Sequence, residues 1–267
     1  NGAMWAAVGA NGIPADRSGT PASTTTITPG TGWREFDLTW IVRAWLANPS
    51  AWYGLKMHAA GNATDATVAY FYTSDQPDPS LRPKLEIVYS IPTPTPTATP
   101  SPTRTPTATR TRTPTRTPTR RPSDHTATPT PSPTPAPSAT LPPGATVRVY
   151  QQGVNGYTGA RDAYLYRYYP TNNYGASPNM YLHIDNINGE VRGFVMNWTN
   201  LGLPANAIVH QAKLRLYQWG HQGHSTLRAE TYLLNRPFNE AEVSWNAASN
   251  GAMWAAVGAN GIPADRS

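Results

Sequence analysis

The 267-residue chain contains no cysteine, which excludes disulfides and thiolate metal sites. Charged residues make up only 13% of it. No run of apolar residues approaches the ~20 that a membrane-spanning helix needs, so we expect no membrane span. Tyrosine, tryptophan, threonine, asparagine and glycine are plentiful instead. This balance is typical of an extracellular all-β domain with a polar, aromatic surface, and not of a helical cytosolic enzyme.

The formal net charge of +6 is concentrated in one part of the chain. Six arginines lie between residues 104 and 121 and Asp124 is the only acid near them, so this stretch carries +5 (six minus one). It has no interleaved aromatic residues and no pattern of a folded groove. The sequence therefore predicts no nucleic-acid binding, and favours an acidic polysaccharide or a neighbouring domain as the partner of these arginines.

Residues 92–145 form a low-complexity tract that begins PTPTPTATPSPT. It has almost no apolar side chains to bury. Proline at nearly alternate positions predicts an extended polyproline-II spacer. Such tracts are often O-glycosylated, and the sequence leaves open whether this one is decorated or bare. Candidate glycosylation sites are Thr95, Thr97, Thr107 and Thr115 in the tract, and Asn62 and Asn197 in Asn-x-Thr sequons.

Both flanks of the tract contain short β-strand patterns. In AKLRLYQ (212–218), Leu214 and Leu216 alternate with Lys213 and Arg215, as in a strand with one buried face. Only LTWIVRAWL (38–46) has apolar residues at helical spacing. About ten such strands separated by glycine, proline and asparagine turns predict an all-β fold, a jelly-roll-like β-sandwich with one short helix.

Residues 1–18 and 250–267 are the same octadecamer, NGAMWAAVGANGIPADRS. The identity predicts a window cut from a periodic array with a repeat of 249 residues (250 minus 1). We expect 1–91 to be the C-terminal part of one β-sandwich domain, 92–145 a linker, and 146–267 the N-terminal part of the next. Two geometries stay open: one long covalent chain, which the identical octadecamers favour, or domains completed between chains.

Five motifs stand out when the chain is read in the order 146–267 and then 19–90. They are DAYLYRYYPTNNYGASPNMYLHI, VRGFVMNWTNLGLPANAIVHQAKLRLY, RPFNEAEVSWN, GWREFDLTWIVRAWLANPSAWYGLKMHA and FYTSDQPDPSLRPKLEIVY. These motifs resemble those of the DNRLRE (disaggregatase-related) β-sandwich modules of secreted microbial proteins. Ser244 stands where the family pattern has threonine, and Leu38 where it has valine. The resemblance covers the whole spliced domain but not the tract, and it implies an accessory role in adhesion, carbohydrate contact or surface architecture at the surface of a bacterium or archaeon.

No combination of residues predicts an active site, so we expect a protein that is not an enzyme. Close carboxylate pairs are more typical of turns and polar rims than of acid–base catalysis. The histidine pair in GHQGH is more typical of a solvated hairpin tip than of a metal site, because no third ligand is placed beside it. The carboxylate pairs are Glu240 with Glu242 and Glu35 with Asp37; the histidines are His221 and His224, with His58, His183 and His210 scattered on strands.

We expect no cofactor, with calcium as the alternative that stays open. Sandwich modules often fix loops with a calcium ion bound by carboxylate and carbonyl oxygens. Aspartates at loops and strand ends also stabilise turns through their own backbone, which is the simpler interpretation. The aspartates concerned are Asp16, Asp75, Asp162 and Asp185.

Tyrosines crowd one predicted strand. Tyr164, Tyr166 and Tyr168 alternate, so they share a face. Three interpretations stay open: an aromatic ladder in the core, a contact with a neighbouring domain, and a platform on which sugars stack.

These patterns favour a structural subunit of an extracellular filament, in which tandem β-sandwich domains are joined by extended linkers and associate with themselves head to tail. We expect the Thr–Pro residues to lie in a groove lined by tyrosine and tryptophan. The alternative is a carbohydrate-binding adhesin module of the cell surface. An accessory domain of a surface hydrolase is a third hypothesis.

Overall fold

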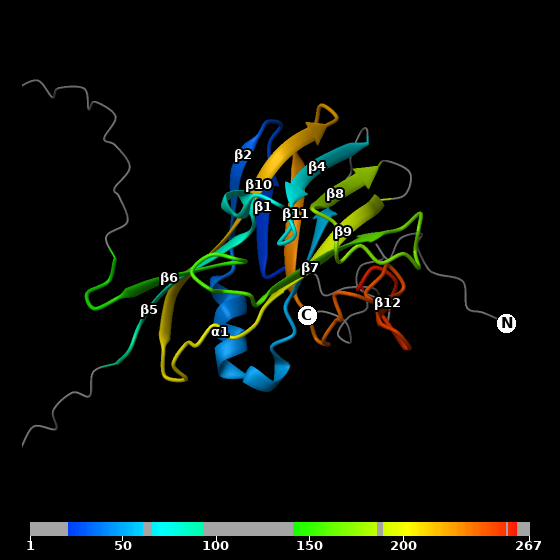
Figure 1. The fold of residues 1–267 in the computed structure, drawn as a ribbon. Coiled ribbons are helices and arrows are strands. Elements are labelled where there is room, and N and C mark those ends of the chain that lie inside the picture. The colour runs from blue at the N-terminus through cyan, green and yellow to red at the C-terminus, as the bar shows by residue number, and fades with distance from the viewer. Residues whose placement is uncertain (1–20, 61–65, 93–140, 186–188, 255, 261–267) are drawn as a thin grey trace, which may run out of the picture. The chain divides into compact units, whose positions relative to one another are not determined.

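The computed structural model describes residues 21–60, 66–92, 141–185, 189–254 and 256–260 (Figure 1). These residues form strands, one α-helix (α1, Thr39–Ala47) and two 3-10 turns (Pro49–Ala51 and Pro79–Leu81). The fold is all-β with one short helix, as the sequence predicts. The strands are β1 (Ser23–Ile27), β2 (Gly32–Asp37), β3 (Leu55–Ala60), β4 (Thr67–Tyr72), β5 (Lys84–Ser90), β6 (Thr146–Gln151), β7 (Ala160–Tyr166), β8 (Asn179–Asp185), β9 (Gly189–Trp198), β10 (Ile208–Gln222), β11 (Leu227–Leu233), β12 (Ala247–Ser249) and β13 (Ala252–Met253).

Strands β1 to β11 form one curled antiparallel sheet (Figure 1). Its order is β1-β11-β3-β9-β8-β4-β10-β5-β6, with β2 added on β10 and β7 on β9. The long β10 pairs with β2, β4 and β5, and its register shifts twice, at Val209/Gln211 and at Gln218/Gly220. Such irregularities bend a strand and strengthen its twist, which lets the sheet curl around a core.

The N-terminal segment (residues 21–92) and the C-terminal segment (residues 141–260) interleave in this sheet. Every strand from β1 to β5 pairs with a strand between β6 and β11. Among the described residues, no two strands of the N-terminal segment pair with each other. The N-terminal segment therefore obtains all of its ladder hydrogen bonds from the C-terminal segment. The predicted domain boundaries stay a prediction, because residues 1–20 and 93–140 lie outside the described residues.

The segments that precede and follow the tract meet in the sheet at β5 and β6. Tyr89 lies opposite Thr146, and the antiparallel register continues to Lys84 opposite Gln151. The chain thus leaves the sheet after Ser90 and re-enters it before Thr146 along neighbouring strands.

The main core lies inside the curled sheet and is closed by the helix. Alternate residues of the strands point inward, such as Leu214 and Leu216 of β10, and α1 adds Ile41, Val42 and Trp45. The opposite side of β10 carries Lys213, Arg215, Tyr217 and Trp219, all half-buried. None of the helices in the described parts of the chain is long and apolar enough to cross a membrane.

Candidate functional site

A second apolar cluster lies on the outward side of β7 and β9. Alternation along β9 sends Phe194 and Met196 into the main core and Val195 to the other side. There Val195 meets Ala163 and Leu165 of β7, and residues after β11 cover all three. We call the surface formed by the outward side of β3, β7 and β9 and by residues 234–248 the seat. Its apolar residues are Ala163, Leu165, Val195, Leu234, Val243, Trp245 and Ala248.

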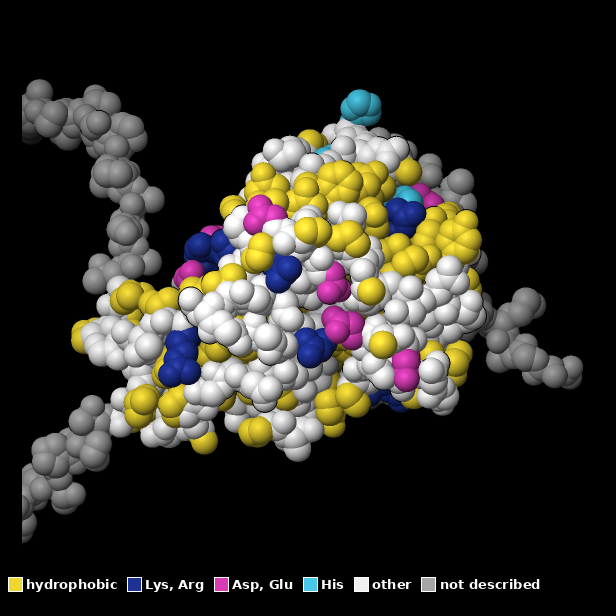
Figure 2. Space-filling view, viewed as in Figure 1, with side chains coloured by type: hydrophobic (Ala, Val, Ile, Leu, Met, Phe, Trp, Pro, Cys, Tyr) yellow, Lys and Arg dark blue, Asp and Glu magenta, His cyan; other side chains and the backbone are white. Residues whose placement is uncertain are grey.

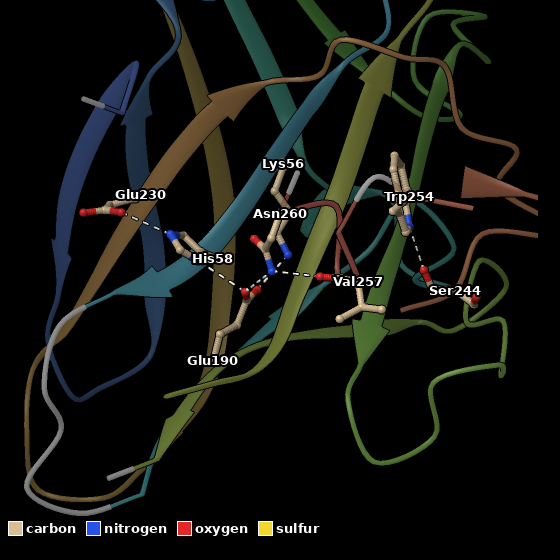
Figure 3. A network of polar contacts seen from close by, with 8 residues as sticks. All are labelled: Lys56, His58, Glu190, Glu230, Ser244, Trp254, Val257 and Asn260. Carbon is tan, nitrogen blue, oxygen red and sulfur yellow. Dashed lines mark hydrogen bonds and ion pairs between the residues drawn. The ribbon is translucent and has the colours of Figure 1, made fainter. Parts of the chain in front are cut away.

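The second copy of the octadecamer occupies the seat. Trp254 is buried in the second cluster, and its Nε1 donates to the backbone oxygen of Ser244 over 2.9 Å (Figure 3). Ala259 is fully buried in the same cluster. The backbone N–H of Trp254 donates to the carbonyl of Asn246 over 3.1 Å. The octadecamer is therefore an integral part of the domain's packing at residues 252–254 and 256–260.

A buried polar network joins this copy to the sheet (Figure 3). Lys56 Nζ lies 2.7 Å from Glu190 Oε1. His58 bridges two carboxylates: its Nδ1 lies 3.3 Å from Glu190 Oε2, and its Nε2 lies 3.1 Å from Glu230 Oε2. Asn260 donates from Nδ2 to Glu190 Oε2 over 3.1 Å. All five residues are at most 5% exposed.

The charge on Glu190 is stabilised by its partners. Burial alone would raise the pKa of Glu190, but the Lys56 ammonium and the His58 ring together hold that pKa well below its usual value. Gly193 leaves room for the pair, since a Cβ there would lie 2.2 Å from Glu190 Oε1 and 2.7 Å from Lys56 Nζ. A buried ion pair of this kind fixes one arrangement of its partners, because any slip leaves a charge without compensation.

An aromatic strip crosses the outward side of the β2–β10–β4–β8 region and continues to the loop after β7. Neighbouring ring centroids lie between 4.1 and 6.4 Å apart. Figure 2 shows hydrophobic side chains gathered over β4 and β10. Aromatic faces that are partly exposed favour contact with flat apolar surfaces. The strip consists, in spatial order, of Trp33, Tyr217, Tyr72, Trp219, Tyr70, Tyr181, Tyr164, Tyr174, Tyr166, Tyr168 and Tyr169.

Two cations lie on the strip. Lys84 Nζ lies 4.3 Å from the ring centroid of Trp33. The Arg192 guanidinium lies 3.9 Å from the ring of Tyr166 and 4.8 Å from that of Tyr181. These contacts hold the rings in place and add positive charge to the strip.

The three tyrosines singled out from the sequence belong to this strip. Tyr164 and Tyr166 are half-buried on β7, and Tyr168 follows the strand with 50% of its surface exposed. Tyr164 also packs against the main core, and stacks on Tyr174 with centroids 4.1 Å apart. The ring of Tyr166 lies 5.6 Å from that of Tyr168.

Of the candidate glycosylation sites, only Asn197 lies among the described residues. It is half-buried on β9, and its Oδ1 accepts a hydrogen bond from the Trp198 backbone N–H over 2.8 Å. The others, Thr95, Thr97, Thr107, Thr115 and Asn62, lie outside the described residues.

The first carboxylate pair holds backbone in place. Glu240 Oε1 accepts from the backbone N–H of Asp162 over 2.7 Å, and Glu240 Oε2 lies 3.3 Å from Arg161. Glu242 Oε2 accepts from the backbone N–H of Asn250 over 3.0 Å.

The second carboxylate pair lies on β2. Glu35 lies 3.0 Å from both Lys213 and Arg215, and Asp37 accepts from the Thr39 backbone N–H at the start of α1.

Asp162 is the most perturbed of the aspartates considered for calcium. Its Oδ2 accepts from the Ser74 backbone N–H over 2.9 Å. Burial, with the nearby charges of Glu240 and Asp75, raises the pKa of Asp162 to about 7. Asp185 accepts from the Tyr168 hydroxyl over 3.2 Å, and Asp16 lies outside the described residues. Within the described ranges, no group of three or more ligand side chains is arranged to hold a metal ion.

Comparisons with protein-family models, with curated proteins and with solved structures find no match to this chain. The seat and its network were not found from the sequence, because Lys56, Glu190 and Asn260 lie on separate parts of the chain. The octadecamer itself was the one signal that pointed to the seat's occupant.

Proposed function

We propose that this chain is a structural, non-catalytic unit of an extracellular filament built from tandem β-sandwich domains. One observation carries the proposal: every strand of the N-terminal segment pairs with the C-terminal segment, and the second octadecamer is packed into the same domain. The resemblance to DNRLRE modules supports the same role, since those modules are accessory surface domains.

The position of Asn260 supports a covalent path through the octadecamer to β1. Asn260 corresponds to Asn11, which precedes Ser23 by twelve residues (23 minus 11). Asn260 is bonded to Glu190, which His58 links to Glu230, and Glu230 lies opposite Thr24 of β1. This path crosses from β9 through β3 and β11 to β1, about 14 Å for three strand spacings. Twelve residues reach up to about 40 Å when extended, so a continuous chain spans this path easily.

The pairing of β5 with β6 supports an array of domains and linkers. In spliced order β6 is the first strand of a domain and β5 its last, and the two are neighbours. Each domain then begins and ends at one place on the sheet, with the tract leading to the next domain. Such head-to-tail association does not close on itself and therefore produces a filament.

Electron microscopy of the intact secreted protein tests the proposal, with regularly spaced beads along a fibre as the expected image. Denaturing electrophoresis tests the covalent geometry: a very large band or a ladder indicates one covalent chain, and a band near 28.9 kDa excludes it and leaves, for a filament, domains completed between chains. Isolated particles without repeats would contradict the filament.

A carbohydrate-binding adhesin is the second candidate function, and the aromatic strip favours it. Its rings lie within stacking distance of one another over several strands and present partly exposed faces, as a platform for a chain of sugars requires. Binding to a glycan array that depends on these rings would support it.

A further inference from the structure

We propose that the seat is a self-recognition site, which accepts residues 1–11 of a second copy of this chain in place of the chain's own residues 250–260. The proposal deepens the filament proposed above and rests on it for its biological role. It identifies the seat as the surface of one domain that binds the octadecamer of the next.

The first octadecamer carries every side chain that the second one places in the seat. Trp5 corresponds to Trp254, Ala10 to Ala259 and Asn11 to Asn260. The seat recognises these side chains through one hydrogen bond to the Ser244 carbonyl, one to the Glu190 carboxylate, and a fully buried methyl group. Each chain thus contains two identical ligands and one seat among its described residues.

Both ligands of a chain are tethered near its own seat. Residues 250–260 follow β12 directly, so their effective concentration at the seat is of the order of millimolar, as for ligands on short linkers. Residues 1–11 of the same chain precede β1, which pairs with β11, by a linker long enough to reach the seat. A second chain at micromolar concentration therefore competes poorly while either tethered copy is intact, and binds when both are weakened or bound elsewhere.

Exchange at the seat brings the rest of the second chain to the right place. Its Asn11 would lie where Asn260 lies now, and its β1 follows twelve residues later, within reach of β11 of the first chain. Its N-terminal segment can then supply β1 to β5, whose partners all belong to the C-terminal segment. The same contacts thus join domains in one covalent chain or between two chains.

A peptide-binding experiment on the full chain tests the proposal. The probe is the fluorescent peptide NGAMWAAVGANGIPADRS, and the control peptide has alanine at its positions 5 and 11 in place of Trp and Asn. We expect the fourfold variant Trp5→Ala/Asn11→Ala/Trp254→Ala/Asn260→Ala, in which neither tethered copy carries the recognised side chains, to bind the probe at least tenfold more tightly than the native chain does. The control peptide should bind neither protein.

A matched variant separates the two copies. Trp5→Ala/Asn11→Ala makes the same substitutions in the first octadecamer, and we expect it to bind the probe no better than the native chain. Equal binding of probe and control peptide, or equal gains in the two variants, would overturn the proposal. If the fourfold variant is unfolded, excess probe should restore its β-sheet circular dichroism, and failure to do so would equally overturn the proposal.

The outcome is separable from that of the proposed function. If the seat binds the probe but electron microscopy shows isolated particles, the self-recognition site is supported and the filament proposal is excluded. If the protein forms filaments but its seat does not bind the probe, the filament proposal stands and the proposed role of the seat is excluded.

Discussion

Asn260 donates a hydrogen bond to Glu190 Oε2 over 3.1 Å, on the same carboxylate that holds Lys56 at 2.7 Å through its other oxygen. A residue of the octadecamer therefore completes a buried ion pair between β3 and β9. The contact requires a donor at this position, because the pKa of Glu190 lies well below its usual value and the carboxylate stays charged.

Asn260→Asp should lower the free energy of unfolding by roughly 3 kcal/mol, because it replaces the donor with a second buried carboxylate beside Glu190. Urea unfolding at pH 7 measures the effect. Asn11→Asp is the matched control at the same position of the first octadecamer, and we expect it to change stability by less than about 0.5 kcal/mol. Equal effects in the two variants would show that the contact with Glu190 contributes nothing specific.

Lys56→Met should also cost about 3 kcal/mol, because Glu190 then keeps its charge without the ammonium. Adding Glu190→Gln should recover part of that loss, and the double-mutant cycle should give a coupling above about 1 kcal/mol. Lys213→Met is the control: Lys213 pairs with Glu35 over a similar distance of 3.0 Å, but at the surface. Its effect should stay below about 1 kcal/mol. Additive effects of the Lys56 and Glu190 substitutions would contradict a buried pair.

Asp162 should give the protein a pH dependence that a neutral isostere removes. Because its pKa is raised to about 7 from 3.8, the folded state holds this proton between these values while the unfolded state has lost it. This group's contribution to stability is therefore present at acidic pH and is lost as pH rises through 7. Its upper limit is about 4 kcal/mol.

The measurement is the free energy of unfolding of the native chain and of Asp162→Asn between pH 4.5 and 8. The difference between the two proteins isolates Asp162 from groups of opposite sign, such as His183, whose pKa burial lowers to about 4. We expect the free energy of unfolding of Asp162→Asn, relative to that of the native chain, to increase as the pH rises. If the free energies of unfolding of the two proteins change in parallel with pH, the pKa of Asp162 is not raised.

The aromatic strip predicts binding of a neutral polysaccharide. Tyr72→Ala and Trp219→Ala should each weaken retention by a soluble glucan roughly tenfold in affinity electrophoresis, since each removes a ring face from the middle of the strip. Trp40→Ala is the control, because Trp40 is 53% exposed on α1 and takes no part in the strip. Retention that is unchanged in the first two variants, or lost equally in all three, would exclude the strip as the binding surface.

Local patterns were sufficient to predict ten strands and the helix of this fold, but not β1, β12 and β13. The alternation in residues 212–218 predicts a strand, and β10 buries Leu214 and Leu216 on one side. The helical spacing in residues 38–46 predicts a helix, and α1 runs from Thr39 to Ala47. The all-β class follows from many such short patterns, and that prediction is confirmed.

The buried network could not be predicted in the same way. Lys56 stands between Leu55 and Met57, so alternation places it on the side of β3 that faces away from the main core. Such a position is normally solvated, and nothing in the local sequence shows that residues 234–260 cover it. Its partner Glu190 is 134 residues away, and pairing over that distance is decided by sheet topology. Whether a lysine at such a position is exposed or buried, as Lys56 is, therefore depends on the long-range topology of the sheet and not on the residue type.

The neighbouring ends of β5 and β6 have a consequence for how spacing between domains can change. Because Tyr89 and Thr146 face each other on adjacent strands, the tract is attached to a domain at one place, and its length can change without moving either strand. In the proposed filament the tract joins β5 of one domain to β6 of the next. Gain or loss of Thr–Pro units by slippage during DNA replication would therefore lengthen or shorten the period of that filament while leaving its folded units intact.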